Sequence, residues 1–376
     1  MGGTVAWTSR LHPPPISRGK APGASQQADR VVCSLPRPKE RGKRYCLRAA
    51  GTWQGNLKGG SLFTYQIYGL CLESNISLPQ LLPCSGGRVD VHFHLDGASQ
   101  GADLIFPPMA GHGRNPPPFV AYRSSNGYVL RWSDYFDFCI SSDGRRIACH
   151  PRPGVEEALV RLALFGRVLS LAMHLQGIPN LHSSAVATPS GAVAFLAAQG
   201  KGKSTLATLC ALQGHPLVTE EVLALRRVDE KFYVYPGYPQ VRLSPDSLEF
   251  LASYLPRPLK SEPDDDKFRV YLGDVKGLFC TEPQSLRAIC LLDPFSGSPG
   301  CGVAIEEVSP QQALAEVVQN ILNVDLLDRE VIARHFGFLA ELVARVPVRR
   351  LRYPVGLWHL PNVYVAVKDP LLSRGQ

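Results

Sequence analysis

The chain has 376 residues, 45% of them hydrophobic, and a formal charge of +8. This apolar content is enough for a substantial core and excludes a chain that is disordered throughout. Residues 1–60 hold eleven Lys and Arg against two acidic residues, a net of +9, so the rest of the chain is near −1 and no basic face is expected on it.

Residues 1–60 are also rich in Pro, Gly and Ser and lack apolar periodicity, which predicts a disordered basic tail. Short segments rich in aromatic and β-branched residues follow, separated by Gly, Pro, Asn and Asp. This pattern predicts a small β-rich domain over residues 61–150. Its expected strands are Phe63–Leu70, Val89–Leu95, Phe119–Arg123, Gly127–Trp132 and Tyr135–Ile140.

Strands and helices alternate over residues 151–376, which predicts an α/β domain. Its first helix, Val155–Gln176, is apolar but contains Arg161 and Arg167, so we expect it to be buried in the protein and not to span a membrane. The strands expected next are His182–Ala187, Ala192–Ala197, Leu217–Thr219, Val222–Arg226, Phe232–Tyr235 and Leu286–Leu292. Helices are expected at Ser204–Leu212, after Asp246, near Pro310–Asn320 and at Asp328–Arg345, with an acidic loop at Glu262–Asp266.

The segment 197–205 fits the Walker A pattern of a phosphate-binding loop (P-loop), with Ala in place of the first Gly. Its glycines allow successive N–H groups to turn toward one point, and the following helix adds its positive N-terminal end. Lys203 is expected to reach the β and γ phosphates of ATP, and the Ser204 hydroxyl to bind Mg²⁺. The predicted nucleotide-binding residues are Ala197, Gln199, Gly200, Lys201, Gly202, Lys203, Ser204 and Thr205.

Two adjacent carboxylates, Glu220 and Glu221, directly follow the apolar strand 216–219. Phosphoryl transfer requires a carboxylate that holds Mg²⁺ or orients the attacking hydroxyl. Neighbours on an extended segment point to opposite sides, so both can face the phosphates only if the chain bends there. A solvated pair of glutamates at a strand end is the alternative.

Several segments together resemble the C-terminal catalytic domain of HPr serine kinase/phosphorylase, and more closely its small relatives encoded in lasso-peptide and similar gene clusters. The resemblance covers residues 61–365 and implies a two-domain, Mg²⁺- and ATP-dependent kinase. The acceptor it implies is a serine hydroxyl of a protein or a ribosomal precursor peptide. The segments are Ile178–Thr188 (IPNLHSSAVAT), Val193–Leu206 (VAFLAAQGKGKSTL), Gln213–Leu225 (QGHPLVTEEVLAL), Tyr235–Ser247 (YPGYPQVRLSPDS), Leu327–Val355 and Tyr65–Leu82.

The resemblance also implies roles for individual residues. His182 and His215 match histidines of the family, and Glu220 and Glu221 fall on its paired aspartates. On this basis Glu220 is the predicted base, with His182 and Lys203 as further catalytic residues, and Ser204 with Glu221 is the predicted metal site. Glu replaces Asp at both positions, and Ala197 and Gln199 replace the family's usual Gly and Ser. Each longer side chain displaces its carboxylate by roughly 1 Å, a misplacement that can lower a rate about a hundredfold.

Two alternatives to an active kinase remain open. One is a weak or inactive relative that binds ATP or peptide without catalysis. The other is a nucleic-acid-associated ATPase that uses the basic tail, although no nucleic-acid partner is expected. Arg242 is a candidate for contacting phosphate or a substrate carboxylate. His92 with His94, and Cys149 with His150, supply too few ligands for a metal site.

Ten cysteines without a C-x-x-C pair, and no apolar segment after Met1, predict a reduced, cytoplasmic protein. Neither a membrane partner nor a zinc site is expected. A homo-oligomer is compatible with the sequence.

Overall fold

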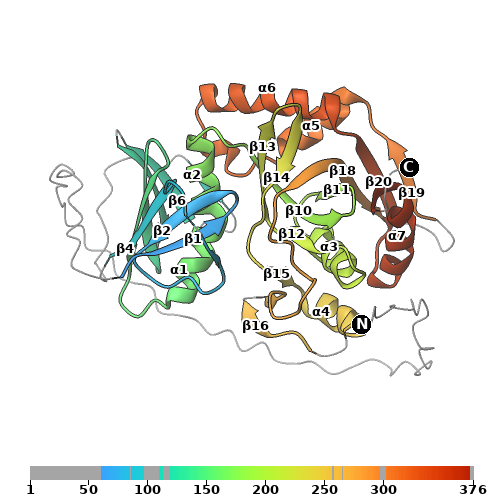
Figure 1. Ribbon diagram of the computed structural model, residues 1–376, viewed down its shortest axis with the longest axis horizontal. Coiled ribbons are helices and arrows are strands. Elements are labelled where there is room, and N and C mark those ends of the chain that lie inside the picture. The colour runs from blue at the N-terminus through green and yellow to red at the C-terminus, as the bar shows by residue number, and fades with distance from the viewer. Residues whose placement is uncertain are drawn as a thin grey trace, which may run out of the picture. The chain divides into compact units, whose positions relative to one another are not determined.

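The structure is a computed structural model that describes residues 61–84, 86–96, 110–112, 119–124, 126–255, 258–264, 266–296 and 302–372. The predicted basic tail, residues 1–60, lies outside the described residues. The described residues belong to one compact unit. Figure 1 shows a mixed α/β protein with two large sheets and a few helices.

The first sheet has nine strands in the order β3-β1-β2-β4-β9-β8-β7-β6-β5. Alternate residues of its strands face a common core, as in β8, where Phe136, Phe138 and Ile140 are all buried. The strands are β1 (Phe63–Ile67), β2 (Leu70–Ser74), β3 (Leu82–Pro83), β4 (Val91–Leu95), β5 (Ala110–His112), β6 (Phe119–Ser124), β7 (Gly127–Trp132), β8 (Phe136–Ser141) and β9 (Arg146–Pro151).

The prediction of one strand over Phe63–Leu70 is wrong, because the chain reverses at Tyr68 and Gly69. Their φ angles of +55° and +73° make a tight turn that joins β1 and β2 as an antiparallel hairpin. The strand β9 is absent from the predicted set. Its last residue, Pro151, pairs with Phe136 of β8, so the sheet extends one residue into the segment assigned to the next domain.

The helix predicted at Val155–Gln176 forms but is not regular. It consists of α1 (Glu157–Ala163), a π-helical turn η1 (Leu164–Val168) and α2 (Leu169–Leu175), with a kink at Gly166, where ψ is −106°. π-Helical turns inside α-helices are frequent at functional sites. Of the helices that the structure describes, this segment alone is long and apolar enough to cross a membrane by length and composition. That is weak evidence, because 61% of its apolar window is buried in the protein.

The second sheet has the order β11-β10-β13-β14-β18-β20-β19, with β12 also paired to β10. It is mixed: β11, β18 and β20 run parallel to one another, and the remaining pairs are antiparallel. Its strands are β10 (Asn180–Thr188), β11 (Gly191–Leu196), β12 (Leu217–Thr219), β13 (Val222–Val228), β14 (Lys231–Val234), β18 (Gln284–Phe295), β19 (Ala304–Glu307) and β20 (Val348–Pro354). The predicted strands of residues 182–235 and 286–292 are confirmed, within a few residues at their ends.

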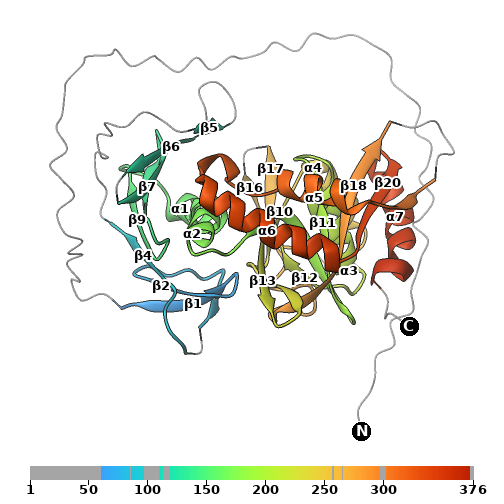
Figure 2. The ribbon, with the colours of Figure 1, turned by 90° about the horizontal axis from the view of Figure 1, so that it is seen from above.

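Helices cover both faces of this sheet (Figures 1 and 2). On one face, α5 (Pro310–Gln319) and α6 (Arg329–Arg345) share a hydrophobic core with the helical segment 157–175 and the first sheet. On the other face, α3 (Lys203–Leu212), α4 (Pro245–Ala252) and α7 (Leu360–Val367) enclose a second core. The helices predicted at Ser204–Leu212, Pro310–Asn320 and Asp328–Arg345 are therefore confirmed. The predicted division of the chain at residue 150 stays a prediction, since one core is common to both parts.

A small third sheet has the strand order β15-β17-β16 and contributes residues to the second core. Its strands are β15 (Gln240–Leu243), β16 (Ser261–Asp264) and β17 (Lys267–Tyr271). The prediction of a solvated acidic loop over Glu262–Asp266 is wrong in part, because residues 261–264 pair with β17 as a hairpin. Acidic residues are poor strand formers in isolation, and here the cross-strand partners of β17 impose the strand.

Candidate functional site

The predicted phosphate-binding loop connects the end of β11 to the start of α3. Gly200 and Gly202 have φ angles of +79° and +87°, conformations that glycine adopts without strain. Ala197 has no positive φ, so Ala is accommodated where the Walker A pattern usually has Gly. Gly202 is the N-cap of α3, and no side chain caps the helix. The first amides of α3 are thus left for an anion at the positive end of the helix.

Lys203 is buried at the first position of α3. Its Nζ donates hydrogen bonds to the carbonyl oxygens of Ala197, at 2.8 Å, and Ala198, at 3.3 Å. Burial lowers the pKa of Lys203 to about 8, an effect that Glu220 opposes. A phosphate beside this ammonium would favour its charged form, so the residue suits anion binding.

Glu220 and Glu221 form a bend between β12 and β13, which both pair with β10. Glu221 has a φ of +69°, a left-handed conformation that is unfavourable by about 1–2 kcal/mol for a residue with a Cβ. This is the bend that two adjacent carboxylates require in order to face the same region. Strain of this kind gathers at functional sites.

The structure brings Ser204 together with Glu220. The Ser204 Oγ donates a hydrogen bond to Glu220 Oε1 at 2.6 Å. The sequence predicted Ser204 and Glu221 as metal ligands. In the structure Ser204 contacts Glu220 instead, which is the carboxylate predicted as the base. The α3 helix presents Ser204 to Glu220, the first residue of this bend.

Two oxygen ligands side by side fit Mg²⁺, which usually keeps several waters and is held by one or two carboxylates plus substrate phosphates. Among the described residues there is no cluster of three or more His, Cys, Asp or Glu that would hold a metal without such help. Ser204 and Glu220 would hold Mg²⁺ together with the phosphates of a nucleotide.

Glu220→Gln is expected to raise the melting temperature of the metal-free protein at pH 8 and to leave it nearly unchanged at pH 5. Burial, and then the neighbouring Glu221, raise the pKa of Glu220 from 4.5 to about 7. The unfolded carboxyl ionises above pH 4.5 while the native one stays protonated, so stability falls as the pH rises from about 4.5 to about 7. The loss is at most about 3 kcal/mol, and glutamine avoids it. Thermal unfolding in EDTA measures the difference, with exposed Glu249→Gln as the control; an equal gain at both pH values would contradict this account.

His182, in β10, lies beside the bend and pairs with Val222. Burial, and then Lys203, lower its pKa to about 4, so the imidazole is neutral at pH 7. Arg167 from η1 also contributes to this shift, and Glu221 in turn acts on the Arg167 guanidinium. Arg167 Nη1 donates to Asn323 Oδ1 at 3.1 Å, which anchors the arginine close to Glu221.

Two buried tyrosines, Tyr68 and Tyr238, lie near Glu221. Tyr68, from the β1–β2 turn, is fully buried and donates from its hydroxyl to the carbonyl oxygen of Phe165 at 3.0 Å. Burial, then Tyr238, Glu221 and Glu220, raise the pKa of Tyr68. A Cβ at Gly237 would lie 3.0 Å from the Tyr68 ring, so glycine permits this close approach. The first sheet thus contributes a residue to the neighbourhood of the glutamates.

None of Arg167, Tyr68 and Tyr238 is recognisable as a site residue from the sequence. Arg167 lies within an apolar helical run, and Tyr68 lies in a segment that reads as one strand. The one local indication for Tyr68 is that Gly69 follows it, because glycine favours turns. The contacts that hold Tyr68 and Arg167 in place span 97 and 156 positions of the chain.

Other predicted residues are placed elsewhere. The Thr205 hydroxyl is hydrogen bonded to Ser247 Oγ at 3.1 Å, so its backbone alone remains for the nucleotide. His215 Nε2 lies 3.3 Å from the Tyr364 hydroxyl. His92 pairs with Glu73, while His94 and His150 both pair with Asp96. Gln199 and Lys201 are exposed in the loop.

Comparisons with known proteins add little to this geometry. No protein-family model matches the chain, and no curated protein matches it. One similar solved structure is that of the Hpr(Ser) kinase/phosphatase from Coxiella burnetii, at 12% sequence identity and a TM-score of 0.27. The similarity covers 51% of this chain and 96% of that one.

Proposed function

We propose that this protein is a Mg²⁺- and ATP-dependent kinase that transfers the γ-phosphoryl group of ATP to a serine hydroxyl of a protein or peptide. The observation that carries the proposal is the 2.6 Å contact between Ser204 Oγ and Glu220 Oε1 at the start of an uncapped helix. A loop for phosphates, a buried lysine and a metal-binding oxygen pair are the parts that such a reaction needs. The serine acceptor comes from the resemblance of the sequence segments.

Each residue has a distinct part in this proposal. The loop amides and Lys203 bind the phosphates. Ser204 and Glu220 hold Mg²⁺, which when bound neutralises charge on the phosphates. Glu221 accepts the proton of the acceptor hydroxyl, and Arg167 fixes its position. This exchanges the two glutamate roles expected from the sequence, because contact with Ser204 decides which carboxylate faces the metal.

A catalytically weak relative that binds ATP or peptide is the second candidate. The observation in its favour is the buried position of Glu220 next to Glu221. Burial and this neighbour raise the pKa of Glu220 to about 7, which leaves much of the carboxyl protonated at neutral pH before a metal binds. It predicts nucleotide binding without turnover.

Transfer of labelled γ-phosphate to serine-containing peptides distinguishes the two candidates. We expect label on the peptide with the wild type, and at least the same rate with Glu220→Asp combined with Glu221→Asp, because the shorter carboxylates are those of the family. The binding-only relative is supported if both proteins bind Mg·ATP and both leave every serine peptide unlabelled. In that case the kinase proposal is wrong.

A further inference from the structure

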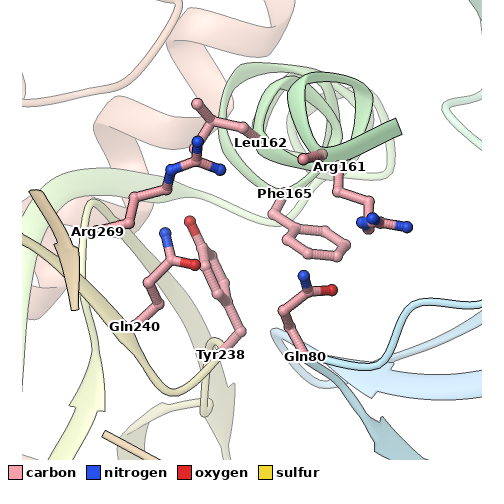
Figure 3. A pocket seen from close by; sticks show the side chains of 8 residues that line it. Gln80, Arg161, Leu162, Phe165, Tyr238, Gln240 and Arg269 are labelled. Atoms are coloured by element: carbon pink, nitrogen blue, oxygen red, sulfur yellow. The ribbon is translucent and has the colours of Figure 1, made fainter. Parts of the chain in front are cut away.

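Two pockets of the described residues differ greatly in size. The first lies between the helical segment 157–168 and the small sheet, where Gln80, Arg161, Gln240 and Arg269 line it (Figure 3). Its volume of about 10 Å³ leaves room for one water at most. The second pocket has a volume of about 340 Å³, which lies within the range of small-molecule sites, about 300–1,000 Å³.

The larger pocket lies between α7 and the residue that precedes β19. Its lining includes four apolar and two polar side chains, those of Val303, Pro354, Val365, Ala366, His359 and Asn362. Apolar walls with a few polar groups that fix orientation are typical of sites for small organic ligands. An imidazole and an amide can each donate and accept hydrogen bonds, as the edge of a heterocyclic base requires.

An exposed tryptophan lies next to this pocket. Trp358 belongs to η3 (Leu357–His359), which leads into α7, and it is 72% exposed. Its ring lies over Gly356, where a Cβ would come within 2.6 Å of Trp358 Cζ2. The ring of His359 lies beside it, with centroids 5.6 Å apart. The indole therefore has a defined position although it is not buried, and its face offers a platform on which a planar base can stack.

The pocket adjoins the phosphate-binding loop through Tyr353. The Tyr353 hydroxyl donates to the carbonyl oxygen of Lys201 at 3.1 Å, and a Cβ on Gly202 would lie 3.5 Å from the same hydroxyl. The next residue, Pro354, lines the pocket. Because β11, β18 and β20 are parallel neighbours, their C-terminal ends meet at one edge of the sheet, with β20 about 10 Å from β11. Ligands of α/β sheets bind at such edges.

The position of the glutamates sets the direction of a nucleotide in the loop. Strand β11 pairs with β10 on one side, and β10 pairs with β12 and β13, which flank Glu220 and Glu221. On the other side β11 pairs with β18, and β20 follows. In the proposed reaction the γ-phosphate lies at the glutamates, so the nucleoside leaves the loop on the opposite side. Tyr353 and the larger pocket lie on that side.

We propose that this pocket binds the adenine base of ATP, with Trp358 stacked on the ring and Asn362 hydrogen bonded to its edge. The inference rests on the proposed function and identifies the part of that site that recognises the nucleoside. The amide oxygen and nitrogen of Asn362 match the N6 donor and the N7 acceptor of adenine. The apolar walls cover the rest of the base.

Nucleotide binding to the full-length protein tests this inference without turnover. Calorimetric titration with a non-hydrolysable ATP analogue is compared with titration with inorganic tripolyphosphate, both in the presence of Mg²⁺. We expect the analogue to bind about tenfold more tightly, because tripolyphosphate contacts the loop alone. Trp358→Ala and Asn362→Ala should each remove most of this advantage and leave tripolyphosphate binding unchanged, whereas Trp358→Phe should retain part of it.

Phe336→Ala on α6 and Gln311→Ala on α5 are the matched controls for loss of an exposed aromatic ring and an exposed amide, and they should change neither affinity. Melting temperatures establish that each variant is folded. Equal binding of the two compounds by the wild type overturns the inference, as does an unchanged preference in Trp358→Ala and Asn362→Ala. Failure of the kinase proposal alone shows instead as absent phosphate transfer while the preference for the ATP analogue persists. Absence of binding by both compounds overturns both proposals.

Discussion

Replacing Lys203 by alanine is expected to abolish most of the stabilisation that Mg·ATP gives to the protein. The wild type should gain about 2.7 kcal/mol at a hundredfold excess of nucleotide over Kd. In the structure the ammonium is held by the carbonyl oxygens of Ala197 and Ala198, which positions it at the phosphate-binding loop. Without it, the loop amides alone face the β and γ phosphates.

The apo form of the Lys203→Ala protein should remain folded, because burial already disfavours the charge of this lysine. Calorimetric or fluorescence titration with Mg·ATP measures the loss of affinity. Lys276→Ala, which removes an exposed lysine, is the matched control and should bind as the wild type does. Wild-type affinity in the Lys203→Ala protein would show that this lysine does not contact the phosphates.

The two glutamates are expected to separate by role when each is changed to glutamine. Glu220→Gln should weaken Mg²⁺-dependent ATP binding as well as turnover, because it removes the carboxylate that contacts Ser204. Glu221→Gln should leave ATP binding nearly intact and lower kcat on a serine peptide by about a hundredfold or more, as expected for loss of a general base. Binding at several Mg²⁺ concentrations, together with single-turnover transfer, separates the two effects.

The opposite pattern, with Glu221→Gln losing Mg²⁺-dependent binding, would restore the assignment expected from the sequence. Glu221→Gly supplies an independent check, because glycine accepts the φ of +69° without strain. That variant should be at least as stable as the wild type in thermal unfolding while losing transfer. Strain that is retained at the cost of stability is expected for a residue kept for its chemistry.

Local features of the fold follow from the sequence. The strand–loop–helix unit around residues 191–212 is predicted because an apolar run, two glycines and an alanine- and leucine-rich segment follow one another. The strands before and after Glu220 and Glu221 are predicted for similar reasons. The bend between them is not, because Glu221 has no local preference for a positive φ; pairing of β10 with both β12 and β13 imposes it.

The remaining parts of the candidate site depend on long-range contacts. Tyr68 lies near the glutamates because the β1–β2 turn is hydrogen bonded to Phe165 and to Pro236. Arg167 lies near Glu221 because η1 packs beside it. Arg242 and Arg269 become neighbours through the register of a sheet whose strand β16 reads as a polar loop. Periodicity within one segment carries no information about such juxtapositions.

The melting temperature of the wild-type protein, measured with and without saturating Mg·ATP, tests the central claim most directly. A nucleotide that binds the native state alone at a hundredfold excess over Kd should raise it by roughly 5–10 °C. Omitting Mg²⁺ should remove much of that rise, since Ser204 and Glu220 would lack the ion they hold. An unchanged melting temperature with saturating Mg·ATP would contradict nucleotide binding at residues 197–205, and with it the proposed kinase.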